Sequence, residues 1–181
     1  MAAKKAGAAK NISGRQSASG KASARTAVKP ADTEKQIAAF IAKLAPDNAA
    51  LTRACRAALR QRFPTAFELG YDNYNFLVFG FCSTPKPSSC MVSLAVAANG
   101  AALSFYHGAD LPNPDGVLLG EGKQNRFVRL PCAETLSEPA VERAITAAVA
   151  FTKPPLAKAG SGATVVQSIS AKQRPRKRIG E

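Results

Sequence analysis

The stretch CMVSLAVAANGAALSFYH, residues 90 to 107, predicts a β-hairpin and with it the class of the fold. Apolar residues alternate with smaller or polar ones on both sides of Asn99-Gly100, which is the pattern of two half-buried strands. Asn-Gly favours a tight turn because both of its positions require positive φ. Strands joined in this way are antiparallel. The alternating residues are Val92, Leu94, Val96, Leu103 and Phe105.

Two further stretches extend this sheet. TAFELGYDNYNFLVFGFC, residues 65 to 82, alternates around Asp72-Asn73 and predicts a second hairpin. RFVRL, residues 126 to 130, predicts a fifth strand. An aromatic sheet can stack nucleic-acid bases, but we interpret the aromatic residues of the second hairpin as the core beneath the helices. They are Tyr71, Tyr74, Phe76, Phe79 and Phe81.

Helical periodicity precedes the strands. A first amphipathic helix is expected to begin at a Thr33 cap and to end at Pro46. A second is expected over residues 48 to 62, capped by Asp47 or Asn48. Each has apolar residues along one face and polar residues along the other, so each is expected to pack on the sheet.

A third helix is expected after the strands, over residues 138 to 151, with Ser137 as its cap. Helices grouped at the two ends of an antiparallel sheet favour packing on one of its faces. The sequence therefore predicts an α+β fold: two N-terminal helices, a mainly antiparallel five-stranded sheet and a C-terminal helix, arranged as a two-layer sandwich.

The basic charge is concentrated outside this predicted domain. The chain has a formal charge of +13. Residues 1 to 30 carry seven basic and no acidic residues, residues 153 to 181 carry seven basic and one acidic, and residues 31 to 152 are formally neutral. Both ends are poor in large apolar residues, so they are expected to be disordered, with TVVQSI at residues 164 to 169 pairing only transiently. Such ends bind polyanions electrostatically.

The chain shows no pattern of a disulfide framework, a zinc site or a membrane span. Its one histidine and the scattered cysteines argue against a four-ligand zinc site and favour free thiols in a reducing, cytoplasmic setting. No secretory segment is recognised, although an acid-free N-terminus also resembles an organellar transit peptide. A regulatory disulfide between the second and third cysteines stays an alternative. The cysteines are Cys55, Cys82, Cys90 and Cys132.

The stretch NPDGVLLGEGKQNRFVRL, residues 113 to 130, is rich in glycine but does not match a nucleotide-binding loop. A phosphate-binding loop would need glycine at Val117 and a hydroxyl at Gln124, and a helix rather than a strand would follow. We therefore interpret Gly120 and Gly122 as positions of positive φ in a turn.

This region resembles the signature of the YdhG-like family, domain of unknown function 1801, over GADLPNPDGVLLGEGKQNRFVRL. Asn113 stands where the family usually has an acid before proline, while Asp115 supplies an acid two residues later. The resemblance extends over residues 33 to 152 and implies a frataxin-like sandwich without an assigned activity. The residues that match are Gly108, Leu111, Leu119, Gly120, Gly122, Lys123 and Arg126.

The resemblance also implies iron handling, because one relative is described as an iron chaperone. Iron would require an acidic surface of oxygen ligands, whereas the second helix carries arginines at the corresponding places. No cofactor is therefore predicted, and iron stays a weakly supported alternative. No catalytic constellation is recognised either, so we expect a non-enzymatic ligand-binding or chaperone-like module and leave the oligomeric state open.

Two groups of candidate residues follow from this interpretation. A ligand at the glycine loop would contact Gly120, Gly122, Lys123, Arg126 and His107. A lone histidine is more commonly a half-buried structural residue than a general base, and a basic helix face is more commonly a solvated surface than a binding site. Anion or nucleic-acid contact would use Arg53, Arg56, Arg60, Arg174, Arg176, Lys177 and Arg178. Nucleic-acid association through the two basic ends is the alternative function.

Overall fold

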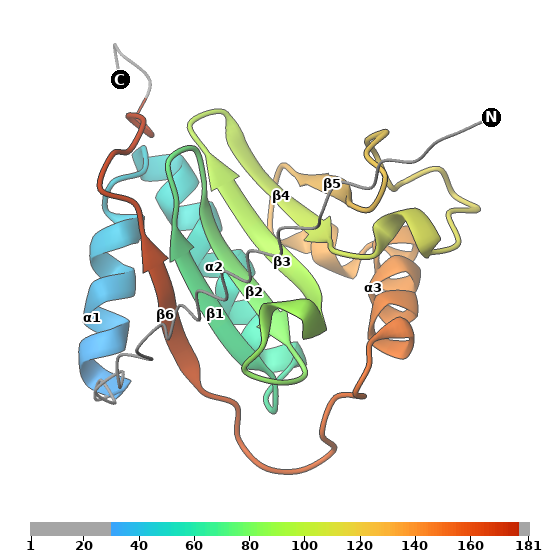
Figure 1. The fold of residues 1–181 in the computed structure, drawn as a ribbon. Helices are drawn as coiled ribbons and strands as arrows, with labels where there is room; N and C mark the ends of the chain where they lie inside the picture. Colours follow the sequence, from blue (N-terminus) through green and yellow to red (C-terminus); the bar gives the residue numbers. More distant parts are fainter. Residues whose placement is uncertain (1–29, 178–181) are drawn as a thin grey trace, which may run out of the picture.

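A six-stranded mixed sheet forms the centre of the protein in a computed structural model that describes residues 30 to 177 (Figure 1). The helices are α1 (Pro30–Ile41), α2 (Pro46–Arg62) and α3 (Pro139–Phe151). The strands are β1 (Phe67–Asp72), β2 (Leu77–Cys82), β3 (Cys90–Ala97), β4 (Gly100–Phe105), β5 (Arg126–Leu130) and β6 (Thr164–Ile169). Short 3-10 helices lie at η1 (Pro87–Ser89), η2 (Gly108–Asp110) and η3 (Glu134–Ser137).

The strand order is β5-β4-β3-β2-β1-β6. The first five strands of the chain pair antiparallel with their neighbours, as the alternation predicts. In the quoted hairpin Leu94 lies opposite Leu103 and Ala97 lies opposite Gly100. The turn is therefore Ala98-Asn99 rather than the predicted Asn99-Gly100, and Gly100, with φ +128°, is the first residue of β4. The α+β class is confirmed. The expectation of five strands is incomplete, because β6 adds a sixth that runs parallel to β1.

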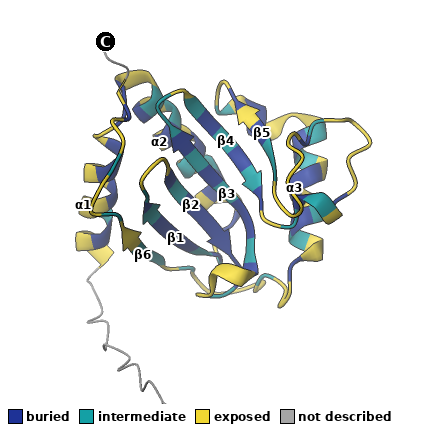
Figure 2. Cartoon of the chain, turned by 45° about the horizontal axis from the view of Figure 1, so that its top comes forward, coloured by how far each residue is buried: buried dark blue, intermediate teal, exposed yellow. Residues whose placement is uncertain are grey.

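One face of the sheet packs against the helices in a single hydrophobic core. The other face has no helix across it (Figure 1). Figure 2 shows buried positions alternating with less buried ones along β3 and β4, β1 and β2 mostly buried, and the buried residues of each helix along one side. The strand residues on the core face include Leu77, Phe79, Phe81, Val92, Leu94, Val96, Leu103, Phe105, Val128 and Leu130.

β1 departs from this apolar pattern. Its residues paired with Leu77 and Phe81 on the core face are Asp72 and Glu68, and both carboxylates are buried. Buried carboxylates require partners, because an isolated charge in the interior is strongly unfavourable. The partners come from α2, from Lys43 between α1 and α2, and from the C-terminal segment, as described below.

Each helix begins at a proline, which differs from the predicted caps. Pro46 and Pro139 occupy the first turns of α2 and α3, where the missing N–H is not needed. Thr33 lies buried inside α1 instead of capping it, because α1 begins at Pro30. Asp47 and Asn48 lie inside α2, whose cap position is Ala45, and Ser137 belongs to η3. The elements were predicted, but their N-terminal boundaries were placed two to three residues late for α1 and α2.

The prediction of a disordered C-terminal end is wrong for residues 153 to 177. β6 pairs along β1 and Val166 packs against the core, so the strand is more than a transient pairing. Arg176, expected in a flexible charged end, is 3% exposed. The physical reason is a buried acid on β1 that needs a cation. The expected disorder of residues 1 to 29 and Arg178 lies outside the described residues.

The glycine loop is held by backbone pairing. Leu119 and Phe127 exchange two hydrogen bonds, of 2.8 and 3.0 Å between nitrogen and oxygen. Gly120 has φ +100°, as predicted, whereas Gly122 does not have positive φ and a Cβ there would meet only Asn125 O, at 3.6 Å. The expectation that Gly122 must be glycine for positive φ is therefore wrong.

Gly108 is the glycine of this region on which packing depends. A Cβ there would lie 2.6 Å from Arg126 Cβ and 2.8 Å from Arg126 N. We expect Gly108→Ala to lower the free energy of unfolding by about 1–3 kcal/mol, the usual cost of forcing extra atoms into a packed site. Gly122→Ala, the matched control, is expected to stay within about 0.5 kcal/mol of the parent. Urea denaturation of the full chain measures both, and equal losses in the two variants would contradict this account.

No helix between residues 30 and 177 combines the length and apolar character needed to cross a membrane.

Candidate functional site

The structure brings the predicted loop residues together at the ends of β4 and β5. Ala109 N donates to Gln124 O at 2.9 Å, which joins η2 to the glycine loop. The guanidinium of Arg126 donates to the carbonyls of Gly122 and Asn125. Arg126 therefore braces its own loop, and these donors are already used.

Lys123 and His107 differ in their surroundings. Lys123 is exposed at the tip of the loop. His107 is half-buried, with its ring 4.8 Å from Tyr106 and 5.3 Å from Phe151 between centroids. These contacts agree with the structural interpretation of this histidine. Gly120 has Phe127 beside it, so the loop offers a packed turn.

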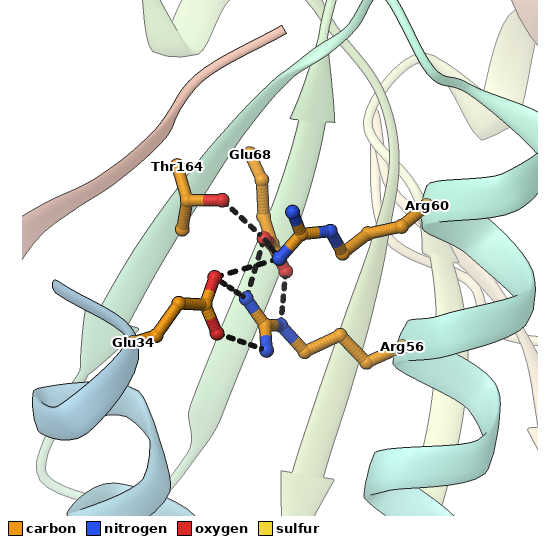
Figure 3. A network of polar contacts seen from close by, with 5 residues as sticks. All are labelled: Glu34, Arg56, Arg60, Glu68 and Thr164. Carbon is orange, nitrogen blue, oxygen red and sulfur yellow. Dashed lines mark hydrogen bonds and ion pairs between the residues drawn. The ribbon is translucent and has the colours of Figure 1, made fainter. Parts of the chain in front are cut away.

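A second set of predicted residues, on α2, forms a charged cluster with acids from two other elements (Figure 3). Arg56 lies between Glu34 of α1 and Glu68 of β1. Its Nη1 and Nη2 each donate to Glu34 at 2.9 Å, while Nε and Nη2 donate to Glu68 at 2.6 and 2.8 Å. Both carboxylates are held in the forked geometry that favours arginine over lysine.

The remaining members complete the network. Arg60 Nη1 donates to Glu34 Oε1 at 2.6 Å and lies 3.6 Å from Glu68 Oε2. Thr164 of β6 donates its hydroxyl to Glu68 at 2.8 Å. Helical spacing places Arg53, Arg56 and Arg60 along one side of α2, so three consecutive turns present arginines towards α1. The network thus joins α1, α2, β1 and β6.

Electrostatics in the cluster keeps both signs ionised. The hydrogen bond from Arg56 is the largest influence on Glu34 and holds its pKa below the usual 4.5, against the opposing effect of burial. Burial alone would lower the pKa of Arg56, but its hydrogen bonds with Glu68 and Glu34 outweigh burial and raise it. Arg56 also lies over the ring of Phe79, at 5.3 Å from the centroid.

A groove of about 370 Å³ opens beside this cluster, lined by Ile41, Arg53, Arg56, Ala57 and Arg60. Arg53 is exposed and forms no ion pair with the acids of residues 30 to 177. Arg60 is half-exposed, with 47% of its side chain accessible. Three arginines facing two carboxylates leave one positive charge at the groove.

The structure thus separates the predicted basic residues. Arg56, expected on a solvated or anion-binding face, is 12% exposed and saturated by acids, so it positions the site rather than contacting solvent freely. Arg176 is buried against Asp72 and is removed from the predicted anion-contact set. Arg174 and Lys177 are exposed.

Other polar features are structural in character. Cys82 and Cys90 lie opposite each other across β2 and β3, as free thiols. A hydrogen bond with Cys82 and burial raise the pKa of Cys90, so its thiol stays protonated and poorly reactive. A smaller cavity of about 240 Å³ lies between α2 and α3, and its lining includes both partners of the Arg62–Glu142 ion pair. Over residues 30 to 177, no three metal-ligating side chains are grouped to hold an ion.

The acids at the base of the cluster were not predicted as site residues. The alternation of β1 in the sequence favours Phe67, Leu69 and Tyr71 as its buried face and would leave Glu68 and Asp72 facing solvent. The strand pairing reverses this, because Glu68 and Asp72 lie opposite the core residues Phe81 and Leu77. Neither the burial of the acids nor the identity of the compensating arginines has a local signal in the sequence.

Comparison of the chain with protein-family models, curated proteins and solved structures found no match.

The lowered pKa of Glu34 predicts a pH dependence of stability. The unfolded chain takes up a proton at Glu34 at a higher pH than the folded protein does. The stabilisation is therefore present above about pH 4.5 and is lost as the pH falls through the lowered folded value. Urea denaturation between pH 6 and pH 3 should give a shallower loss for Glu34→Gln than for the parent. Asp32→Asn is the matched control in α1, and a Glu34→Gln profile parallel to that of the parent would contradict the assignment.

Proposed function

We propose that this chain is a YdhG-like domain with a frataxin-like layout, acting as a non-enzymatic module that binds a small anionic ligand in the groove between α1 and α2. The observation that carries the proposal is the groove of about 370 Å³ with three arginines in its lining. The volume lies within the range usual for small-molecule sites, about 300–1,000 Å³.

The free donors of the groove favour an anion. Arg53 has no acidic partner within residues 30 to 177, and Arg60 shares Glu34 with Arg56. Arginine presents a planar fork that fits carboxylate and phosphate oxygens. Arg56 is already fixed by two carboxylates, so it supplies a rigid wall and positive potential without having to be ordered on binding. Ile41 and Ala57 add an apolar surface beside the charges.

Iron handling receives less support from the same geometry. The two carboxylates of this cluster, Glu34 and Glu68, have Arg56 between them. A cation entering there would meet a guanidinium rather than a cluster of free oxygen ligands. We therefore favour a ligand bearing phosphate or carboxylate groups.

The test uses pyrophosphate as the probe and the full chain at low ionic strength. A ligand at ten times its dissociation constant is expected to stabilise the folded state by about 1.4 kcal/mol, measured as a shift in urea denaturation. Arg53→Gln should reduce the affinity at least tenfold, because it removes the arginine that has no acid partner. Arg129→Gln, which removes an exposed arginine from the opposite edge of the sheet, is the matched control and should bind like the parent.

A further variant separates this groove from the glycine loop. Lys123→Gln removes the exposed cation of the loop and should leave pyrophosphate binding unchanged. Loss of binding in Lys123→Gln with retention in Arg53→Gln would place the anion at the loop and refute the groove. Absence of any stabilisation at 10 mM pyrophosphate would refute the anionic ligand.

A second candidate function is nucleic-acid association through the N-terminal residues. The seven basic residues among residues 1 to 30, without an acid, favour it. The C-terminal residues contribute less to this candidate than their charge suggests, because Arg176 compensates a buried acid. Binding of this kind is electrostatic and carries little sequence preference.

Salt dependence tests this second candidate in full-length variants. Replacing four N-terminal cations by glutamine should lower the slope of log affinity for double-stranded DNA against log salt by about 0.9 for each phosphate that the chain no longer neutralises. The four are Lys4, Lys5, Lys10 and Arg15. The control replaces four exposed cations of the described residues, Lys123, Arg129, Lys153 and Lys158. Equal reductions of the slope in the two variants would contradict binding through the N-terminal residues.

A further inference from the structure

The C-terminal segment, residues 162 to 177, is attached to the rest of the protein as an added strand. A stretch that is mostly exposed leaves α3, passes below the sheet and reaches the edge beside β1 (Figure 1). There β6 pairs parallel with β1, from Glu68 opposite Thr164 to Asp72 opposite Ile169. The sheet is already complete as an antiparallel unit without it. The segment therefore resembles a peptide laid along an open sheet edge.

Side-chain burial contributes little to this attachment. All six residues of β6 are half-buried or exposed, and Ile169 is 54% exposed. Figure 2 shows the exposed end of β6 at the rim of the sheet. Val166 is the residue of the strand that packs against the core. Backbone pairing and polar contacts therefore provide most of the attachment.

Two buried acids of β1 hold the two ends of the segment. Near its start, Thr164 donates its hydroxyl to Glu68. Near its end, Arg176 donates to Asp72, and its other donors reach the carbonyls of Asn73 and Phe76. Asp72 and Arg176 are both almost fully inaccessible to solvent. The acids lie four residues apart on the core side of one strand, whereas Thr164 and Arg176 are twelve residues apart in the chain. The segment is therefore extended only over β6 and then turns, so that Ser170 N and the Arg176 guanidinium both reach Asp72.

Neighbouring groups surround Asp72 as well, while the buried Nε of Arg176 has no hydrogen-bond partner among residues 30 to 177. Lys43 also donates to Asp72, Gln173 donates to Asp72 O at 3.1 Å, and Leu44 forms a parallel bridge with Arg176. Burial alone would raise the pKa of Asp72, but hydrogen bonds from Lys43, Gln173 and Arg176 hold it below its usual value. Asp72 is therefore ionised at neutral pH. Removing Arg176 would leave a buried carboxylate with Lys43, whose side chain is 43% exposed, as its remaining cation.

We propose that the β1 edge is a peptide-binding site whose occupant is the chain's own C-terminal segment, bound in cis and exchangeable with the same segment of a second copy. The site takes a basic peptide that is extended over residues 164 to 169 and turns after them, with a hydroxyl residue at the position of Thr164, a β-branched pair after it and an arginine at the position of Arg176. This inference is independent of the anionic ligand, although Glu68 contributes to both sites.

The experiment converts the tether into a free peptide within the full chain. A protease recognition sequence inserted after Ala159 lies in an exposed part of the connecting stretch. After cleavage, the C-terminal fragment is expected to coelute with the body on size exclusion at micromolar concentration. A fluorescein-labelled peptide of residues 161 to 177, in hundredfold excess, is then expected to replace it, followed by fluorescence anisotropy.

Variant peptides test the chemistry of recognition. The peptide carrying Arg176→Gln should compete at least about 100-fold less well, since it leaves a buried acid without its buried partner. The peptide carrying Arg174→Gln has the same net charge as the Arg176→Gln peptide, but it alters an exposed side chain. It should therefore compete within about threefold of the parent peptide. A scrambled peptide of identical composition should not compete, which separates recognition from general attraction of a basic peptide.

Several results would overturn the proposal. A fragment that hundredfold excess of labelled peptide fails to displace would show a fixed strand rather than an exchangeable ligand. Equal competition by the Arg176→Gln and Arg174→Gln peptides would show that Asp72 does not select an arginine. A body that releases the fragment and does not rebind the peptide, or that unfolds in saturating peptide, would refute the site.

Discussion

Compensation of two buried carboxylates on β1 organises the half of the protein that contains α1, α2 and β6. Glu68 and Asp72 point to the core side of the sheet, where the other strands present apolar residues. An unpaired charge there would cost several kcal/mol, so each acid must be met by a cation that is itself held in place. Arg56 meets Glu68 and Arg176 meets Asp72. The positions of α2 and of the C-terminal segment are tied to β1 for this reason.

This arrangement divides the basic residues of the chain by role. Arg56 and Arg176 form ion pairs with the buried acids of β1, whereas Arg53 and Arg60 keep hydrogen-bond donors near solvent at the groove. Arg56 and Arg176 are each matched by a buried acid, so the pairs leave the net charge unchanged but remove two arginines from those that a partner can contact. Glu68 connects the two regions, since it accepts hydrogen bonds from Arg56 at the groove and from Thr164 of β6.

The opposite half of the sheet is stabilised by apolar packing and backbone hydrogen bonds instead of buried ion pairs. β2 to β5 and α3 contribute apolar side chains to a continuous core, and the glycine loop closes on β5 by backbone bonds between Leu119 and Phe127. Gly108 permits the backbone of η2 to approach Arg126. Two of the loop residues that resemble a family signature have a structural role. Arg126 donates hydrogen bonds to the carbonyls of Gly122 and Asn125, and Gly120 supplies the positive φ of the turn.

The sequence alone determined the features that depend on local periodicity: the three helices, the β3–β4 hairpin, and the apolar face that they share. Alternation and helical spacing are properties of neighbouring residues, so a single sequence contains them. Only the tertiary structure decided that Glu68 and Asp72 would be buried, and that Arg56 and Arg176 would neutralise them. Ion pairs between residues as distant as 72 and 176 leave no local pattern, and β6 gains its order from a strand edge rather than from its own composition. From its charge, the C-terminal end was expected to be disordered. In the structure the buried carboxylate of Asp72 binds Arg176, and this ion pair holds the C-terminal segment against β1.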